Sequence, residues 1–126
     1  MRLLECPAKQ HTKMNPYYDP EKLELEMLSF DEPDLSYEYN TLCFWATKTG
    51  QIYSASDSGC SCPTPFEDDH DRPTRDEVLQ TLERVGSVTQ AESIFDSWNK
   101  GYDDKQYLPA SEKQKLAEWV NARLKP

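Results

Sequence analysis

The first regular pattern along the chain is an alternation of apolar and polar residues over 22–30, KLELEMLSF. Leu23, Leu25 and Met27 fall on one side of this segment and two glutamates fall on the other. A period of two places neighbouring side chains on opposite faces of a strand, and a helix cannot use it. The pattern therefore predicts a strand with one apolar face and one solvated, acidic face.

A second alternation runs through residues 35–47, and its centre, Leu42–Ala46, is apolar on both faces. A strand of this kind is expected at the centre of a sheet. The next residues, 48–50 (Lys-Thr-Gly), offer a short hairpin connection with glycine where a positive φ is needed, and residues 51–56 form the returning strand. The sequence thus predicts a three-stranded antiparallel sheet over about 22–57.

Helical signals begin after residue 73. Each of three segments starts with Ser or Thr followed three residues later by Glu or Gln, a capping box that satisfies the amides at a helix start. The three boxes are Thr74 with Glu77, Thr89 with Glu92, and Ser111 with Gln114. Apolar residues at helical spacing follow each box, and Gly86 and Gly101 stand where the first two helices should end. The predicted helices cover about 75–85, 90–100 and 111–124.

These elements predict an α+β fold in which three C-terminal helices pack on the apolar face of the small sheet. With 126 residues, the chain has the size of one domain. Within the domain 1–126 we expect an irregular N-terminal segment (1–20), an acidic sheet with a cysteine-containing loop (22–71) and a helical layer (74–126).

Charge is distributed unevenly along the chain. The sequence carries 23 acidic and 14 basic side chains, a net charge of −9. Residues 1–71 hold 14 acids and five bases, whereas residues 72–126 hold nine of each. An acidic excess repels nucleic acid and anionic lipid, and it favours a protein partner with a basic face. The carboxylates expected to contact such a partner are Glu24, Glu26, Asp31, Glu32, Asp34, Glu38, Glu67, Asp68, Asp69 and Asp71.

The alternative to a binding surface is a solvated acidic surface that only keeps the protein soluble. The sequence has no run of about 18 apolar residues, and Met1–Pro7 is too short for the apolar region of a signal peptide. We therefore expect no membrane span and no export, and we expect the protein to act in the cytoplasm.

Cys60, Cys62 and His70 are the candidate metal ligands, because tetrahedral zinc binds thiolates and imidazoles. Their spacing argues against such a site, since structural zinc sites favour two residues between paired cysteines and this pair has one. Two alternatives stay open: a redox pair formed by the two cysteines, and a rigid loop in which two small side chains only pack.

An enzymatic role is not expected. A nucleophilic Cys60 with His70 as its base needs positive surroundings to hold a thiolate, and the neighbouring run 67–71 is acidic. The sequence contains no GxSxG elbow, no glycine-rich phosphate loop and no HExxH motif. The helix pair over 75–99 is a poor DNA-reading motif, because its second helix has no base before Lys100.

The segment 57–67 reads DSGCSCPTPFE and follows an aromatic strand and a Thr-Gly hairpin. In this run, and over 39–67 as a whole, the chain resembles a family of small uncharacterised proteins encoded by bacteriophages of actinobacteria. The resemblance implies an accessory phage protein made in the host cytoplasm. It carries over no catalytic, cofactor-binding or partner-binding residue.

Three functional hypotheses follow. The first is a non-enzymatic accessory phage protein that binds a host or phage protein through its acidic sheet and loop face, for instance as an inhibitor. The second is a small metal-binding or redox module that uses Cys60, Cys62 and His70. The third is a virion-associated structural protein.

The segment around Cys60 is expected to be an ordered loop. Gly59 would give the turn its freedom, Pro63 and Pro65 would stiffen the exit, and Phe66 would anchor the loop to the core. If φ at residue 59 is positive, the substitution Gly59→Val is expected to destabilise the protein by about 1 kcal/mol or more.

Overall fold

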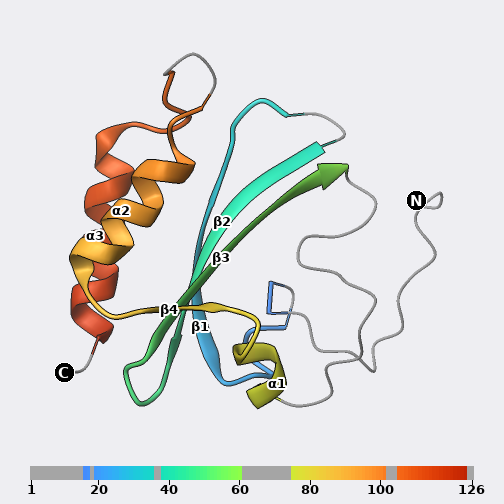
Figure 1. Ribbon diagram of the computed structural model, residues 1–126, viewed down its shortest axis with the longest axis vertical. Coiled ribbons are helices and arrows are strands. Elements are labelled where there is room, and N and C mark those ends of the chain that lie inside the picture. Colours follow the sequence, from blue (N-terminus) through green and yellow to red (C-terminus); the bar gives the residue numbers. More distant parts are fainter. Residues whose placement is uncertain (1–15, 18, 36–37, 61–74, 102–104, 125–126) are drawn as a thin grey trace.

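Four strands and three helices make up the described part of the chain. The structure is a computed structural model that describes residues 16–17, 19–35, 38–60, 75–101 and 105–124 (Figure 1). In chain order the elements are β1 (Leu25–Asp31), β2 (Glu38–Thr47), β3 (Ile52–Cys60), α1 (Arg75–Leu79), β4 (Glu83–Val85), α2 (Val88–Trp98) and α3 (Ala110–Arg123). The protein therefore has an α+β fold.

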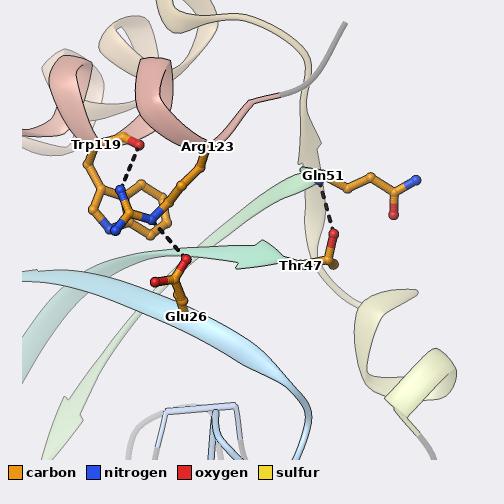
Figure 2. A network of polar contacts seen from close by, with 5 residues as sticks. All are labelled: Glu26, Thr47, Gln51, Trp119 and Arg123. Atoms are coloured by element: carbon orange, nitrogen blue, oxygen red, sulfur yellow. Dashed lines mark hydrogen bonds and ion pairs between the residues drawn. The ribbon is translucent and has the colours of Figure 1, made fainter. Parts of the chain in front are cut away.

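The strands form one antiparallel sheet in the order β1-β2-β3-β4. Pairing of β1 with β2 runs without interruption from Leu25 opposite Thr47 to Asp31 opposite Thr41. The β2–β3 hairpin turns at Gly50, whose φ of 89° suits glycine. Thr47 closes this turn, because its Oγ1 accepts a hydrogen bond from the Gln51 amide at 3.0 Å (Figure 2). The predicted hairpin is confirmed.

The central strand β2 is buried on both of its faces. Leu42, Phe44 and Ala46 point into a core shared with α2 and α3. Cys43 and Trp45 point to the opposite side, into a second core shared with α1. Figure 1 shows the α2–α3 pair on one side of the sheet and α1 on the other. The helices thus cover two faces of the sheet, where the sequence predicted one.

Helices α2 and α3 cover their face of the sheet through narrow apolar stripes. Ala91 and Phe95, one turn apart, are the buried residues of α2, and Leu116 and Val120 are those of α3. The ring of Phe95 meets that of Phe30 from β1 edge to face, with centroids 5.1 Å apart. Full burial of an aromatic or large aliphatic side chain contributes about 1.5–3 kcal/mol, so these few residues hold the helical layer on the sheet.

The opposite face is covered by α1 and by the segment that precedes β1. Val78 and Leu79 of α1 pack with Leu23 against the second core. The indole Nε1 of Trp45 donates a buried hydrogen bond to the Pro16 carbonyl at 2.9 Å. This bond fixes the N-terminal end of the described chain to the middle of the sheet.

The first predicted helix is wrong in length, and one strand was missed. Helix α1 ends at Leu79, and residues 83–85 form β4 where the sequence predicted a helix to 85. Val85 lies opposite Ile52 in the β3–β4 ladder, and both side chains are fully buried. Burial of this pair favours the extended conformation over a further helical turn.

The second and third helices lie where they were predicted, but they begin slightly earlier. Ser87 is the N-cap of α2, and its hydroxyl accepts from the Gln90 amide at 3.0 Å. The Gln90 side chain in turn accepts from the Gly86 amide at 2.8 Å. This pair resembles a capping box two residues before the predicted one, except that Gln90 accepts from the amide that precedes the N-cap. Helix α3 begins after Pro109 and has no side-chain cap.

Asn99 fixes the connection between α2 and α3. Its side-chain Nδ2 donates to the Leu108 carbonyl at 3.0 Å, and its Oδ1 accepts from the Leu108 amide at 2.9 Å. The Asn99 carbonyl also accepts from the Tyr107 amide. Gly101, with φ of 69°, lets the chain pass close to the carbonyl of Lys105. At this turn, the buried Asn99 side chain thus makes the two hydrogen bonds to Leu108 that a backbone N–H and C=O would make in a strand pair.

We predict that Asn99→Ala lowers the free energy of unfolding by about 2–3 kcal/mol, because it leaves the Leu108 amide and carbonyl without partners. Urea unfolding followed by circular dichroism measures this change. Asn121→Ala on the exposed surface of α3 is the matched control and should change stability by less than about 0.5 kcal/mol. Equal effects of the two substitutions would contradict the role given to Asn99.

Candidate functional site

The acidic residues predicted to bind a partner fall into separate groups. Glu24 and Glu26 lie at the start of β1, and the others that are described lie around its end. Asp31 lies five positions after Glu26 along the strand, a distance of about 17 Å. The remaining four, Glu67, Asp68, Asp69 and Asp71, lie outside the described residues.

Glu26 lies on the sheet face that α3 covers; the predicted solvated face of β1 is wrong further along the strand, where Phe30 is buried in the first core. Arg123 Nε donates to Glu26 Oε1 at 3.0 Å (Figure 2). The Arg123 guanidinium lies 4.6 Å from the Trp119 ring centroid, and its Nη1 donates to the Trp119 carbonyl. The Glu26 carboxylate is still exposed, but its charge is matched within the protein.

The second group surrounds the connection between β1 and β2. We call Asp31, Glu32, Asp34 and Glu38 the acidic hairpin; Glu32 is partly buried and the other three are exposed. Within the described part of the chain, none of these four carboxylates forms an ion pair with a base. They form a group of four carboxylates at one end of the sheet for which no described base supplies an ion pair.

A hydrogen-bonded chain links the acidic hairpin to the helical layer. Asn40 Nδ2 donates to Glu32 Oε1 at 2.9 Å, and Trp98 Nε1 of α2 donates to Asn40 Oδ1 at 3.0 Å. The Trp98 ring packs edge to face on Tyr107, with centroids 5.1 Å apart. Glu32 is therefore held in place from α2, and the neighbouring carboxylates are carried on a supported turn.

Asp57 of β3 lies at the same end of the sheet, although it is not among the carboxylates predicted from the sequence to contact a partner. Thr41 of β2 lies opposite both Asp31 and Asp57, so the two aspartates share one face, about 10 Å apart across two strand spacings. Tyr39 Oη donates to Asp57 Oδ2 at 3.1 Å. The signal was present in the sequence: counting outward from the hairpin at 48–50 pairs Thr41 with Asp57.

Gly59 lies in β3, opposite Tyr39, and not in a loop. Its φ lies outside the positive range, so the reason given for its conformational freedom was wrong. What the position requires is space: a Cβ added there would lie 3.3 Å from Tyr39 Oη and 3.5 Å from Cζ. The glycine leaves room for the tyrosine ring to cross the strand and reach Asp57.

We predict that the effect of Gly59→Val depends on Tyr39. With the ring present, valine has to displace it and should destabilise by about 0.5–1 kcal/mol. In the Tyr39→Ala background, the same substitution should stabilise by a similar amount, because valine favours strands and glycine does not. A double-mutant cycle of urea unfolding measures the difference. Equal effects in both backgrounds would rule out this steric coupling.

Cys43 is the cysteine whose side chain the structure describes, and its surroundings keep it inert. The side chain is fully buried in the second core. Burial raises the pKa of the Cys43 thiol to about 12. A hydrogen bond with Thr41 lowers this pKa by a smaller amount, and the negative charge of Asp31 raises it further. A thiol with this pKa has almost no thiolate at neutral pH and is a poor nucleophile or metal ligand.

We predict that Cys43 makes stability depend on pH in the alkaline range. The pKa of the thiol is about 12 in the folded protein, against 9.0 as its ordinary value, so this contribution to stability is complete below pH 9 and is lost as pH rises towards 12. Stability should fall by up to about 1.4 kcal/mol per pH unit. Urea unfolding of the wild type and of Cys43→Ala between pH 8 and 11 isolates the effect, since the other titrating groups are shared. A stability difference that does not change with pH would contradict it.

The metal and redox predictions rest on residues that the structure does not describe in full. Cys60 is the last residue of β3, and Cys62 and His70 lie outside the described residues. Where side chains are described, no three of His, Cys, Asp or Glu are grouped so as to hold a metal ion. The zinc and redox hypotheses stay predictions.

A second surface feature is an open groove of about 340 Å³ on α2 and the start of α3. It is lined by Thr89, Glu92, Ser93, Asp96, Ser97, Lys100 and Lys113. Lys113 donates to Asp96 across the groove at 2.9 Å, and this hydrogen bond raises the pKa of the lysine. The groove has two acids and two bases and no strongly apolar lining, so it offers little to select a ligand.

A family model described as a domain of unknown function, DUF7574, matches residues 14–125. The chain belongs to the DUF7574 family. No curated protein and no solved structure matches it. Membership of DUF7574 assigns no activity, and the resemblance to phage proteins stays a prediction.

The structure also bears on membranes. Along the described stretches, none of the helices of this DUF7574 protein combines the length and the apolarity needed to span a bilayer.

Proposed function

We propose that this DUF7574 protein is a non-enzymatic binding protein whose acidic hairpin contacts a basic surface of a protein partner. The observation that carries the proposal is the grouping of Asp31, Glu32, Asp34 and Glu38 at one end of the sheet without a described base beside them. Asp57 adds a fifth carboxylate on the adjoining strand.

The support of the Glu32 side chain favours recognition over simple solubility. Solubility needs charge but no fixed geometry, whereas Glu32 is oriented by Asn40 and, through it, by Trp98. Asp34 has a φ of 67°, a conformation that aspartate tolerates better than most residues and that turns the chain sharply between the strands. A preorganised array loses less side-chain entropy when a partner binds.

The energetics fit a partner with several basic side chains. An exposed ion pair contributes about 0.2–1 kcal/mol, so no single carboxylate determines binding, but four together reach about 2 kcal/mol. Long-range attraction also raises the association rate, and both effects weaken as salt screens the charges. A basic surface that otherwise binds nucleic acid has the matching sign, and covering it would make the protein an inhibitor.

The resemblance to phage proteins sets the context of this proposal. The partner would then be a host protein in the bacterial cytoplasm or another phage protein. A virion-associated role is the alternative in that setting, and detection of the protein in purified particles would support it.

We predict that neutralising the acidic hairpin weakens selective binding. The variant Asp31→Asn, Glu32→Gln, Asp34→Asn, Glu38→Gln removes four charges while keeping the side-chain shapes. Proteins recovered from host lysate on immobilised wild type should be lost with this variant, and the affinity of a recovered partner should fall by about 2 kcal/mol, roughly thirtyfold. Binding should also weaken between about 50 and 500 mM salt.

The matched control removes four exposed charges elsewhere by Glu21→Gln, Asp76→Asn, Glu83→Gln and Glu118→Gln. Both variants have the same net charge, so a general charge effect would change them equally. Selective loss with the hairpin variant supports the proposal. Equal recovery by wild type and both variants, or loss with both, would show that the acidic hairpin is not a binding site.

A further inference from the structure

Among the described residues, the backbone N–H and C=O groups on the outer edge of β1 have no hydrogen-bond partners. The strand lies at the edge of the sheet, with β2 on one side only. The Glu32 amide donates to the Asn40 carbonyl, which identifies Glu32 and Asn40 as a hydrogen-bonded pair of the antiparallel ladder. Such pairs alternate along the strand, so Leu28 and Phe30 also face β2. The N–H and C=O groups of Met27, Ser29 and Asp31 consequently point outward.

This open segment has clear limits. At its start, the Leu25 amide is satisfied by the Pro20 carbonyl at 2.8 Å. At its end, the chain turns through Asp34 into β2. Among the hydrogen bonds of the described residues, none involves the backbone of Met27, Ser29 or Asp31 across the outer edge. The free edge is therefore five residues long, 27–31, or about 17 Å.

The opposite edge of the sheet is better protected. β4 pairs with β3 from Ile52 to Ser54. Further along β3, the outward amide of Ser58 is taken by the Asp57 side chain at 3.0 Å. Among the described residues, no strand or side chain takes up the outward groups of β1; its pairing with β2 contains no bulge, and its sequence LEMLSFD contains neither proline nor lysine. An edge strand with unpaired backbone groups is a template for another extended chain.

The charge around β1 indicates which chain fits. Glu24, Glu26, Asp31 and Glu32 lie along or beside this strand, and Arg123 pairs with Glu26 alone among them. If a second copy paired through all three outward residues, Ser29 would lie opposite Ser29, and Glu32 would lie opposite a Glu26 that Arg123 already pairs with. The copy would add Asp31 and Glu32 to an edge that already carries the same carboxylates, and the strand itself supplies no base. Added charge of like sign opposes this pairing. An extended segment with basic residues meets no such repulsion.

We propose that the edge of β1 binds an extended, basic segment of a partner protein as an added antiparallel strand. The inference rests on the proposed function and names the kind of partner segment that the acidic end of the sheet recognises. Backbone hydrogen bonds to Met27, Ser29 and Asp31 align the segment. Basic side chains opposite Asp31 and Glu32 select it, and small or β-branched residues lie beside Leu28 and Phe30.

The probe for this inference is the synthetic peptide acetyl-KKVTVTK-amide, whose first two lysines would lie opposite Glu32 and Asp31. Two doubly N-methylated forms serve as a matched pair. Methyl groups on the fourth and sixth residues block the amides that face β1, and methyl groups on the third and fifth block only amides that face away. The two forms have equal charge and composition, so a difference between them reports backbone pairing.

The direct readout is amide hydrogen exchange followed by NMR with the full-length protein. When the peptide occupies about nine-tenths of the sites, the amides of Met27, Ser29 and Asp31 should exchange about tenfold more slowly. The peptide methylated on its third and fifth residues should protect the amides of Met27, Ser29 and Asp31 as well as the unmethylated peptide does. The peptide methylated on its fourth and sixth residues should not protect them. The inference is overturned if the unmethylated peptide, at about 1 mM, leaves these amides unprotected.

The second test uses proline on the protein side. Ser29→Pro removes an outward amide and leaves the β1–β2 ladder intact, since proline is tolerated on edge strands when its nitrogen faces outward. It should weaken peptide binding at least tenfold. Ser56→Pro at the exposed outer edge of β3 is the control and should leave binding unchanged. If Ser29→Pro does not fold, the methylated peptides decide the question.

The outcomes separate this inference from the proposed function. If a partner is lost with the acidic hairpin variant but is bound equally by Ser29→Pro, the hairpin acts through side chains alone, and the edge inference is wrong while the proposed function stands. If both variants lose the partner, both are supported. If the outward amides of β1 become protected with rising protein concentration and no peptide, the occupant is a second copy, which overturns the choice of a basic segment.

Discussion

The two-sided burial of β2 is the constraint on which the architecture depends. Leu42–Ala46 is apolar at every position, so consecutive side chains enter opposite cores. A sheet with one wet face would expose Cys43 and Trp45 to water, and the chain therefore has to supply a covering layer on each side. The α2–α3 pair supplies one layer. Helix α1 and the segment before β1 supply the other, and the bond from Trp45 to the Pro16 carbonyl fixes that segment across the sheet.

The same constraint moves the charge to the ends and edges of the sheet. With both faces of β2 occupied, carboxylates are accommodated where the strands end or where no further strand follows, and the acidic hairpin meets both conditions. The chain from Trp98 through Asn40 to Glu32 then connects the packing of α2 with the position of a surface carboxylate. The core therefore not only stabilises the fold but also sets the geometry of the candidate site.

Local signals were sufficient for the elements that depend on neighbouring residues. The alternation in β2, the glycine of the 48–50 hairpin and the apolar stripes of α2 and α3 all act within a few positions, and each prediction from them agrees with the structure. β4 has three residues, too few for a periodic signal, and its conformation is decided by contact with Ile52, which is distant in sequence. The capping pattern near Thr74 pointed instead to a longer helix.

The sequence predicted the negative charge of the candidate site but not the arrangement of its residues. Segregation of acids in the N-terminal half correctly indicated where charge accumulates, yet only the fold shows that Glu26 meets Arg123, 97 positions later. A salt bridge of that sequence separation leaves no local pattern. Asp57 is a different case, because strand register places it, and register follows from one well-recognised turn.

The acidic side chains around β1 have two physical consequences that cannot be separated. An open edge strand exposes a protein to pairing with copies of itself, and the acidic charge that a second copy would add, with no base in the strand itself, opposes the one register that would use every outward group of 27–31. The same charges attract an extended chain of opposite sign and do not obstruct its backbone. The charges that oppose pairing with another acidic chain therefore also select a basic chain. Proline, a bulge or a covering strand would protect the edge against every partner alike, whereas β1 is guarded only against those that carry its own sign.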